Sequence, residues 1–159
     1  MEQRIKGMEK NQMLMRALHG LNGYSEKSDK IEKNLLHLVV LRVSQLNGCA
    51  FCIDMHSKDL RAAGETEQRL YLLDAWRETE FYTARERAAL AWAEAVTFIT
   101  KGHVSDEVYN EVSKHFSEEE LIDLTVAVTT INTWNRLNIA FRTPAGTYEV
   151  GQFAAVSAN

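Results

Sequence analysis

The apolar residues of this chain recur at the spacing of an α-helix in segment after segment, and this periodicity constrains the fold more than any other feature. The segment from Ile31 to Leu46 is apolar on nearly every side, which is typical of a central, buried helix. The chain contains one proline, Pro144, and few of the Asn-Gly or Asp-Gly turns that join strands. The sequence therefore predicts an all-α fold of about six to seven helices in a single domain, residues 1–159.

Capping residues divide this pattern into individual helices. Thr83 and Ser117 are each followed three residues later by a glutamate, which is the capping-box pattern of a helix start. Gly48 and Gly64 stand where helices are expected to end. We expect helices over about 8–27, 31–46 with Ser28 and Asp29 supplying its N-cap, 49–63, 66–76, 83–100, 105–116 and 117–137. The tail from Thr143 is predicted to be irregular, and we consider a contact between it and another subunit.

The only two cysteines, Cys49 and Cys52, open the helix that follows Gly48. Positions three apart share a helix face, so the two sulfurs can approach closely enough to form a disulfide. His56 lies one turn beyond Cys52 on that face, where an imidazole could exchange a proton with the thiol. A helix N-terminus favours thiolate over thiol because it presents unpaired N–H groups and a partial positive charge. The sequence therefore predicts a reactive dithiol.

Charge and hydropathy exclude several classes of partner. The formal net charge is −4 and the isoelectric point is near 5.7, so the basic surface needed for nucleic-acid binding is absent. Residues 1–7 lack the apolar core of a secretory signal, and no later run reaches the length of a membrane span. We expect a cytoplasmic protein without nucleic-acid or membrane partners. In that reducing compartment, a Cys-x-x-Cys pair is more often catalytic or metal-binding than structural.

Two segments carry a resemblance to a known family. Residues 41–56, LRVSQLNGCAFCIDMH, closely resemble the core motif of the alkyl hydroperoxidase D-like (AhpD-like) branch of the carboxymuconolactone decarboxylase family, and residues 131–138, INTWNRLN, also resemble that branch. The likeness spans roughly residues 35–141. It implies an all-helical fold that assembles as a homotrimer or as a hexamer, and a thiol-based peroxidase or disulfide-reductase activity. The branch that decarboxylates carboxymuconolactone lacks the cysteine pair, so that reaction is disfavoured here.

The resemblance also implies roles for individual residues. Cys52 corresponds to the attacking, peroxidatic cysteine, Cys49 to the resolving cysteine, and His56 to the proton-relay histidine. The implied substrate is a small-molecule hydroperoxide, and the implied electron donor is a lipoyl-bearing or thioredoxin-type protein. We assign no cofactor and no metal ion.

Two positions depart from the family pattern. His37 stands twelve residues before Cys49, where the family usually has a glutamate that takes protons from the relay. A histidine can accept a proton near neutral pH, so we include His37 among the catalytic candidates. It cannot hold His56 in its charged form as a carboxylate would, because two imidazolium ions repel each other. Phe51 replaces a histidine found between the cysteines in other members.

Other interpretations of the cysteines stay open at this stage. Free cysteines can be small buried hydrophobes, and a disulfide can serve a non-enzymatic redox sensor or assembly module. Cys49, Cys52, His56 and His37 could in principle ligate zinc, although one short helix rarely directs three ligands at a tetrahedral centre.

For several further polar and aromatic residues we predict structural rather than catalytic roles. Internal or intersubunit hydrogen bonding is expected for Arg42, Asn132, Asn135 and Arg136. Trp76, Trp92 and Trp134 are interpreted as core or interface anchors, and His19, His103 and His115 as surface or helix-end residues.

Overall fold

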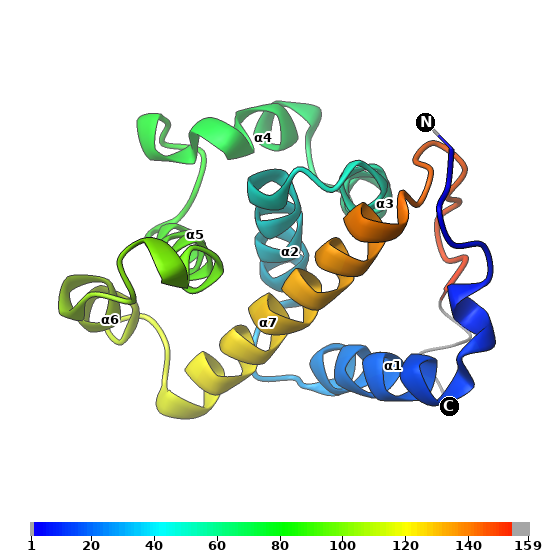
Figure 1. Cartoon of the computed structure of the whole chain (residues 1–159). Coiled ribbons are helices and arrows are strands. Elements are labelled where there is room, and N and C mark those ends of the chain that lie inside the picture. The colour runs from blue at the N-terminus through cyan, green and yellow to red at the C-terminus, as the bar shows by residue number, and fades with distance from the viewer. Residues whose placement is uncertain (1, 154–159) are drawn as a thin grey trace.

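The structure is a computed structural model that describes residues 2–153, apart from the side chain of Glu26. Within these residues the regular structure is entirely helical (Figure 1). The elements are η1 (Met8–Lys10), α1 (Gln12–Lys27), α2 (Lys33–Asn47), α3 (Ala50–Ala62), α4 (Glu67–Leu72), η2 (Leu73–Glu78), α5 (Ala84–Thr97), η3 (Ile99–Lys101), α6 (Asp106–Val112) and α7 (Glu118–Phe141). The predicted all-α fold is confirmed, and residues 125–131, which are rich in β-branched side chains, are helical within α7. None of the described helices combines the length and the apolar composition that crossing a membrane requires.

Helix α2 is the central element, as its apolar composition predicts. In Figure 1 the long helix α7 crosses α2, with α5 and α6 on one side of α2 and α3 on the other. One core cluster joins α2 to α5, α6 and α7 through residues that include Val39, Val43 and Leu124. A second cluster packs the opposite side of α2 against α3, α4, η2 and α5 through residues that include Leu38 and Leu60. Because α2 contributes to both clusters, it fixes the position of α3, which follows α2 after two intervening residues.

The capping signals placed most helix boundaries correctly. Thr83 and Ser117 each accept a hydrogen bond from the backbone N–H of the glutamate three residues on, and each glutamate accepts the N–H of its capping residue, so both capping boxes are confirmed. Gly48 ends α2 in the left-handed conformation, with a φ of 69°. Glycine adopts this conformation without a steric penalty, and it turns the chain directly into α3.

The predicted N-cap of α2 is wrong. Helix α2 begins at Lys33, and Glu32 occupies its N-cap without a side-chain hydrogen bond. Ser28 instead follows the end of α1, and its hydroxyl donates to the carboxylate of Asp123 in α7. Burial alone would raise the pKa of Asp123, but hydrogen bonds from Ser28 and Tyr24 outweigh it and lower that pKa. The Ser28 hydroxyl, which the local sequence pattern predicts as an N-cap, bonds instead to Asp123, 95 residues away in the sequence.

Both ends of the described chain fold over the same end of the molecule (Figure 1). The backbone N–H of Arg4 donates to the carbonyl of Phe141 at 2.9 Å, which ties the N-terminal segment to the end of α7. The irregular tail packs on α3 of its own chain, where Gly146 N–H donates to Asp54 and Lys58 Nζ donates to the Tyr148 carbonyl, each at 3.0 Å. Residues of the tail and of the N-terminal segment line the same cavity as Cys52.

Candidate active site

Cys49 and Cys52 are joined by a disulfide at the start of α3. Their Cα atoms are 5.3 Å apart, within the range that a disulfide spans. Cys49 is the N-cap of α3, and its sulfur accepts the backbone N–H of Cys52 at 3.4 Å. Cys52 therefore lies in the first turn, where the helix dipole and free N–H groups would stabilise a thiolate after reduction.

The sulfur of Cys52 has a hydrogen-bond donor on the opposite helix. Asn138 of α7 is buried, and its Nδ2 lies 3.6 Å from the sulfur of Cys52. A neutral N–H donor at that place favours a negatively charged sulfur. Asn138 was not among the site residues predicted from the sequence. Its signal was the spacing of Asn132, Asn135 and Asn138, which repeats every three residues on one face of an otherwise apolar helix.

The other two asparagines of that face hold the cysteine turn in position. Asn47, the last residue of α2, donates to the Oδ1 atoms of Asn132 and Asn135, each at 2.9 Å. Asn135 is fully buried and donates to the hydroxyl of Ser44 at 3.2 Å. Internal hydrogen bonding of Asn132 and Asn135 is therefore confirmed. These bonds fix the end of α2, and with it Gly48 and the cysteines, against α7.

Cys52 lies on the wall of a large, mostly apolar cavity of about 870 Å³. His56 of α3 and His37 of α2 line the same cavity, so the structure brings three of the four predicted site residues to one cavity. The fourth, Cys49, is buried at the N-cap of α3 and is not a lining residue. The walls come from α1, α2, α3, α7 and both terminal segments, and they include Phe51, Met55, Leu36, Val40, Ile131, Trp134, Phe141, Val150 and Phe153.

The C-terminal tail closes one side of the cavity through Tyr148. Its ring is buried, and its hydroxyl donates to Asp59 of α3 at 2.7 Å. Burial and the hydrogen bond to the Asp59 carboxylate raise the pKa of Tyr148 to about 12. Asp54 supports the same tail. Burial alone would raise the pKa of this carboxyl, but hydrogen bonds from Lys58 and from Gly146 lower it.

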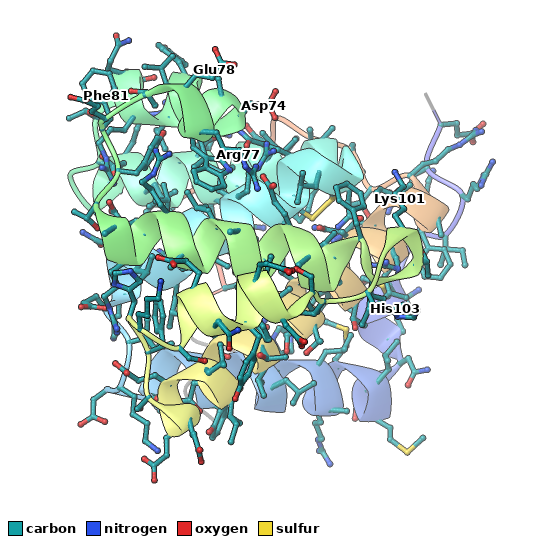
Figure 2. All side chains as sticks on the ribbon, turned by 90° about the vertical axis from the view of Figure 1, so that its left-hand side faces the viewer. Asp74, Arg77, Glu78, Phe81, Lys101 and His103 are labelled. Carbon is teal, nitrogen blue, oxygen red and sulfur yellow. A yellow bond between two sulfur atoms is a disulfide. The ribbon has the colours of Figure 1, made fainter. Side chains whose placement is uncertain are left out.

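Arg42 does not line the cavity. It forms ion pairs on the other side of α2. Its guanidinium binds Glu94 of α5 at 2.8 Å and also contacts Asp74. Glu94 accepts further hydrogen bonds from Trp76 Nε1 and Arg77. Burial alone would raise the pKa of Glu94, but its three donors outweigh burial and lower it. Figure 2 shows Asp74 and Arg77 on the short helix η2 that lies over α5.

The three remaining histidines lie in different surroundings. His19 was expected at the surface or at a helix end, but it lines the cavity and its ring lies 5.7 Å from that of Trp134. His103 is exposed, and His115 pairs with Glu111 at 3.5 Å.

Over residues 2–153, no three His, Cys, Asp or Glu side chains are grouped so that they could hold a metal ion. Cys49, Cys52, His56 and His37 therefore do not form a ready zinc site.

These features define a class: an all-helical protein with a disulfide-forming Cys-x-x-Cys pair at a helix start, facing an apolar cavity that also contains histidines. Residues 12–95 match the carboxymuconolactone decarboxylase family, and the chain belongs to this family as an AhpD-like member.

Similar proteins include the uncharacterized protein YdfG of Bacillus subtilis, with 44% identity over 140 residues, covering 88% of this chain and 95% of YdfG. The uncharacterized protein YnjA of Escherichia coli is 29% identical over 119 residues, which cover 75% of this chain and 65% of YnjA. A crystal structure from Agrobacterium tumefaciens matches with a TM-score of 0.88 and 39% identity, over 92% of this chain and 100% of that one. That protein is of unknown function, and the role of antioxidant defence protein AhpD has been suggested for it.

Proposed function

We propose that the protein is a thiol-dependent peroxidase that reduces organic hydroperoxides, with Cys52 as the attacking thiolate. The observation that carries this proposal is the placement of the two cysteines. Cys52 faces a cavity shared with His56 and His37, whereas its disulfide partner Cys49 is buried away from that cavity. A substrate in the cavity therefore meets Cys52 first, and Cys49 is held within bonding distance to resolve the product.

In the proposed cycle the Cys52 thiolate attacks the distal oxygen of the hydroperoxide. The O–O bond breaks, Cys52 becomes a sulfenic acid, and the departing alkoxide takes a proton from His56 to leave as an alcohol. The Cys49 thiol then loses its proton and its sulfur attacks the sulfur of Cys52; the S–O bond breaks, the disulfide forms, and the departing hydroxide takes up that proton and leaves as water. Two electrons pass from the dithiol to the peroxide. A lipoyl-bearing or thioredoxin-type protein restores both thiols by thiol–disulfide exchange, and His37 exchanges protons with the site.

The walls of the cavity favour an organic substrate over hydrogen peroxide. Phe51 and Met55 flank Cys52 on α3, and Ile131 and Trp134 face the cavity from α7. Aromatic and aliphatic side chains of this kind bind apolar groups by excluding water. We therefore propose an alkyl or aryl hydroperoxide as the substrate class. We also propose a homotrimer or homohexamer as the working assembly, which light scattering of the reduced and oxidised protein would measure.

Counting thiols during turnover tests the proposal. Reduced protein is mixed with cumene hydroperoxide, and we expect two thiols to disappear per peroxide. Cys52→Ser should abolish the reaction. The matched variant Cys49→Ser should still react once and retain a sulfenic acid at Cys52 that dimedone traps. Full peroxide turnover by Cys52→Ser would refute the assignment. If the reduced protein does not react with peroxide but its oligomer mass changes when the disulfide is reduced, the protein would instead be a redox-sensing module.

A further inference from the structure

Thr130 of α7 differs from the neighbouring threonines because its hydroxyl does not bond to the helix backbone. Thr125, Thr129 and Thr133 each donate to a backbone carbonyl one turn earlier in the helix. The hydroxyl of Thr130 makes no hydrogen bond within the described residues, although the residue is only 5% exposed and lines the cavity. The carbonyl one turn before it, that of Val126, accepts the hydroxyl of Thr129 at 3.0 Å. The Thr130 hydroxyl therefore has hydrogen-bonding capacity that no described residue uses, on a residue that lines the cavity.

A second polar atom without a partner lies on the same stretch of wall. His19 of α1 lines the cavity, and its Nδ1 is buried with no hydrogen bond to any described residue. The His19 ring contacts Trp134, which lies one turn beyond Thr130 on α7. This contact places His19 against α7 about one helical turn from Thr130, where α1 meets α7.

Two other polar groups at this junction already have partners. The indole N–H of Trp134 donates to the side-chain oxygen of Asn22 at 3.2 Å, and the hydroxyl of Ser25 donates to the carbonyl of Leu21 at 3.3 Å. The indole N–H of Trp134 is thus already occupied, and the rest of its ring is apolar. Buried polar groups in proteins are nearly always hydrogen-bonded, so two exceptions on one cavity wall indicate a place for a ligand atom.

We propose that Thr130 and His19 form a second polar subsite that binds a hydroxyl or carbonyl oxygen of an otherwise apolar substrate, at a point distant from its hydroperoxide group. The inference rests on the proposed function only in that Cys52 supplies the reaction. It narrows the substrate class to hydroperoxides with an additional oxygen function and a body that packs on Trp134. Thr130 is a specificity-determining residue in this scheme, because it touches the bound molecule but not the reacting oxygens.

A matched pair of substrates tests the subsite. Cumyl hydroperoxides with an isopropyl group on the ring are compared with their carbinol analogues, in which a hydroxyl replaces one hydrogen of that group, as both meta and para isomers. The measured quantity is the ratio of the second-order rate constants for thiol loss, carbinol over isopropyl. We expect Thr130→Val to lower this ratio about three- to ten-fold and to leave the rate with the isopropyl compound within about twofold. Thr133→Val, whose hydroxyl bonds the backbone, should leave the ratio unchanged.

Binding of the unreactive alcohol pair gives the same comparison without chemistry. The alcohols that correspond to the two hydroperoxides are titrated while tryptophan fluorescence is recorded, and Thr130→Val should weaken only the binding of the hydroxylated member. Valine has the shape of threonine, and a thermal scan should show no loss of stability because the lost hydroxyl had no partner. An unchanged preference in Thr130→Val, in rate and in binding, would overturn the subsite. Loss of peroxide reaction in the native protein, with the binding preference intact, would overturn the peroxidase function and leave the subsite standing.

Discussion

Replacing Glu94 with glutamine should destabilise the fold without touching the cavity. The Arg42 side chain is 8% exposed and that of Glu94 is 14%, so the pair is largely desolvated. The second carboxylate near Arg42, Asp74, is 79% exposed and compensates little. Removing one partner of a buried ion pair costs about 3–5 kcal/mol. We expect about 3 kcal/mol for Glu94→Gln, the lower end, because the amide still accepts a hydrogen bond from Trp76.

Urea unfolding of the reduced protein at pH 7 measures this loss, and a thermal scan should show the midpoint falling by roughly 6–12 °C for a chain of this length. Glu119→Gln is the matched control, because Glu119 is 74% exposed in its pair with Lys30 and should cost under about 1 kcal/mol. Thiol reactivity should be unchanged in both variants. A loss below about 1 kcal/mol for Glu94→Gln would refute the inference that Arg42 depends on this carboxylate.

The lowered pKa of Glu94 also determines how the free energy of unfolding should depend on pH. The pKa of Glu94 is lower in the folded than in the unfolded protein, so its stabilising contribution is present above the ordinary glutamate pKa. That contribution is lost as the pH falls below about 4.5 toward the folded-state value. Glu94→Gln should therefore show a smaller decrease in stability between about pH 5 and 3 than the native protein. Equal slopes in the two proteins would contradict this account.

Two further predictions concern the cavity wall. Asn138→Leu removes the donor to the Cys52 sulfur, so iodoacetamide should alkylate Cys52 about three- to ten-fold more slowly at pH 7, measured in a Cys49→Ser background; an unchanged rate would show that Asn138 does not influence the thiolate. Tyr148→Phe breaks the bond to Asp59 and should cost about 1–2 kcal/mol at pH 7. The raised Tyr148 pKa means that its contribution is present below about pH 10 and disappears as the pH rises toward 12, so the native and Tyr148→Phe unfolding energies should converge there.

The sequence predicted most completely those features that depend on residues close together in the chain. Both capping boxes, the break at Gly48 and the cysteines at the start of α3 follow from interactions within about four residues. The buried nature of α2 was also evident, because its apolar residues occupy nearly all sides of the helix.

Features that depend on distant partners were not predictable in the same way. Ser28 is a good N-cap by type, but Asp123 in another helix binds its hydroxyl. Asn138 and His19 became site residues only once α7 and α1 were packed around the cavity. The unsatisfied hydroxyl of Thr130 has no sequence signature at all, because its three neighbouring threonines look the same in sequence and bond the backbone. Side-chain pattern alone cannot show which polar atom lacks a partner.

The position of His37 leads to the most direct test of the proposed peroxidase chemistry. His37 lines the cavity with Cys52, at the position where a glutamate is expected in AhpD-like relatives. The measurement is stopped-flow reaction of the reduced protein with tert-butyl hydroperoxide, counting thiols consumed, for the native chain and for His37→Glu. We predict that two thiols disappear per peroxide in the native protein, with His37 serving as a working relay variant. Thiol loss in His37→Glu but none in the native chain would contradict the account, since the native dithiol would then serve a reaction other than peroxide reduction.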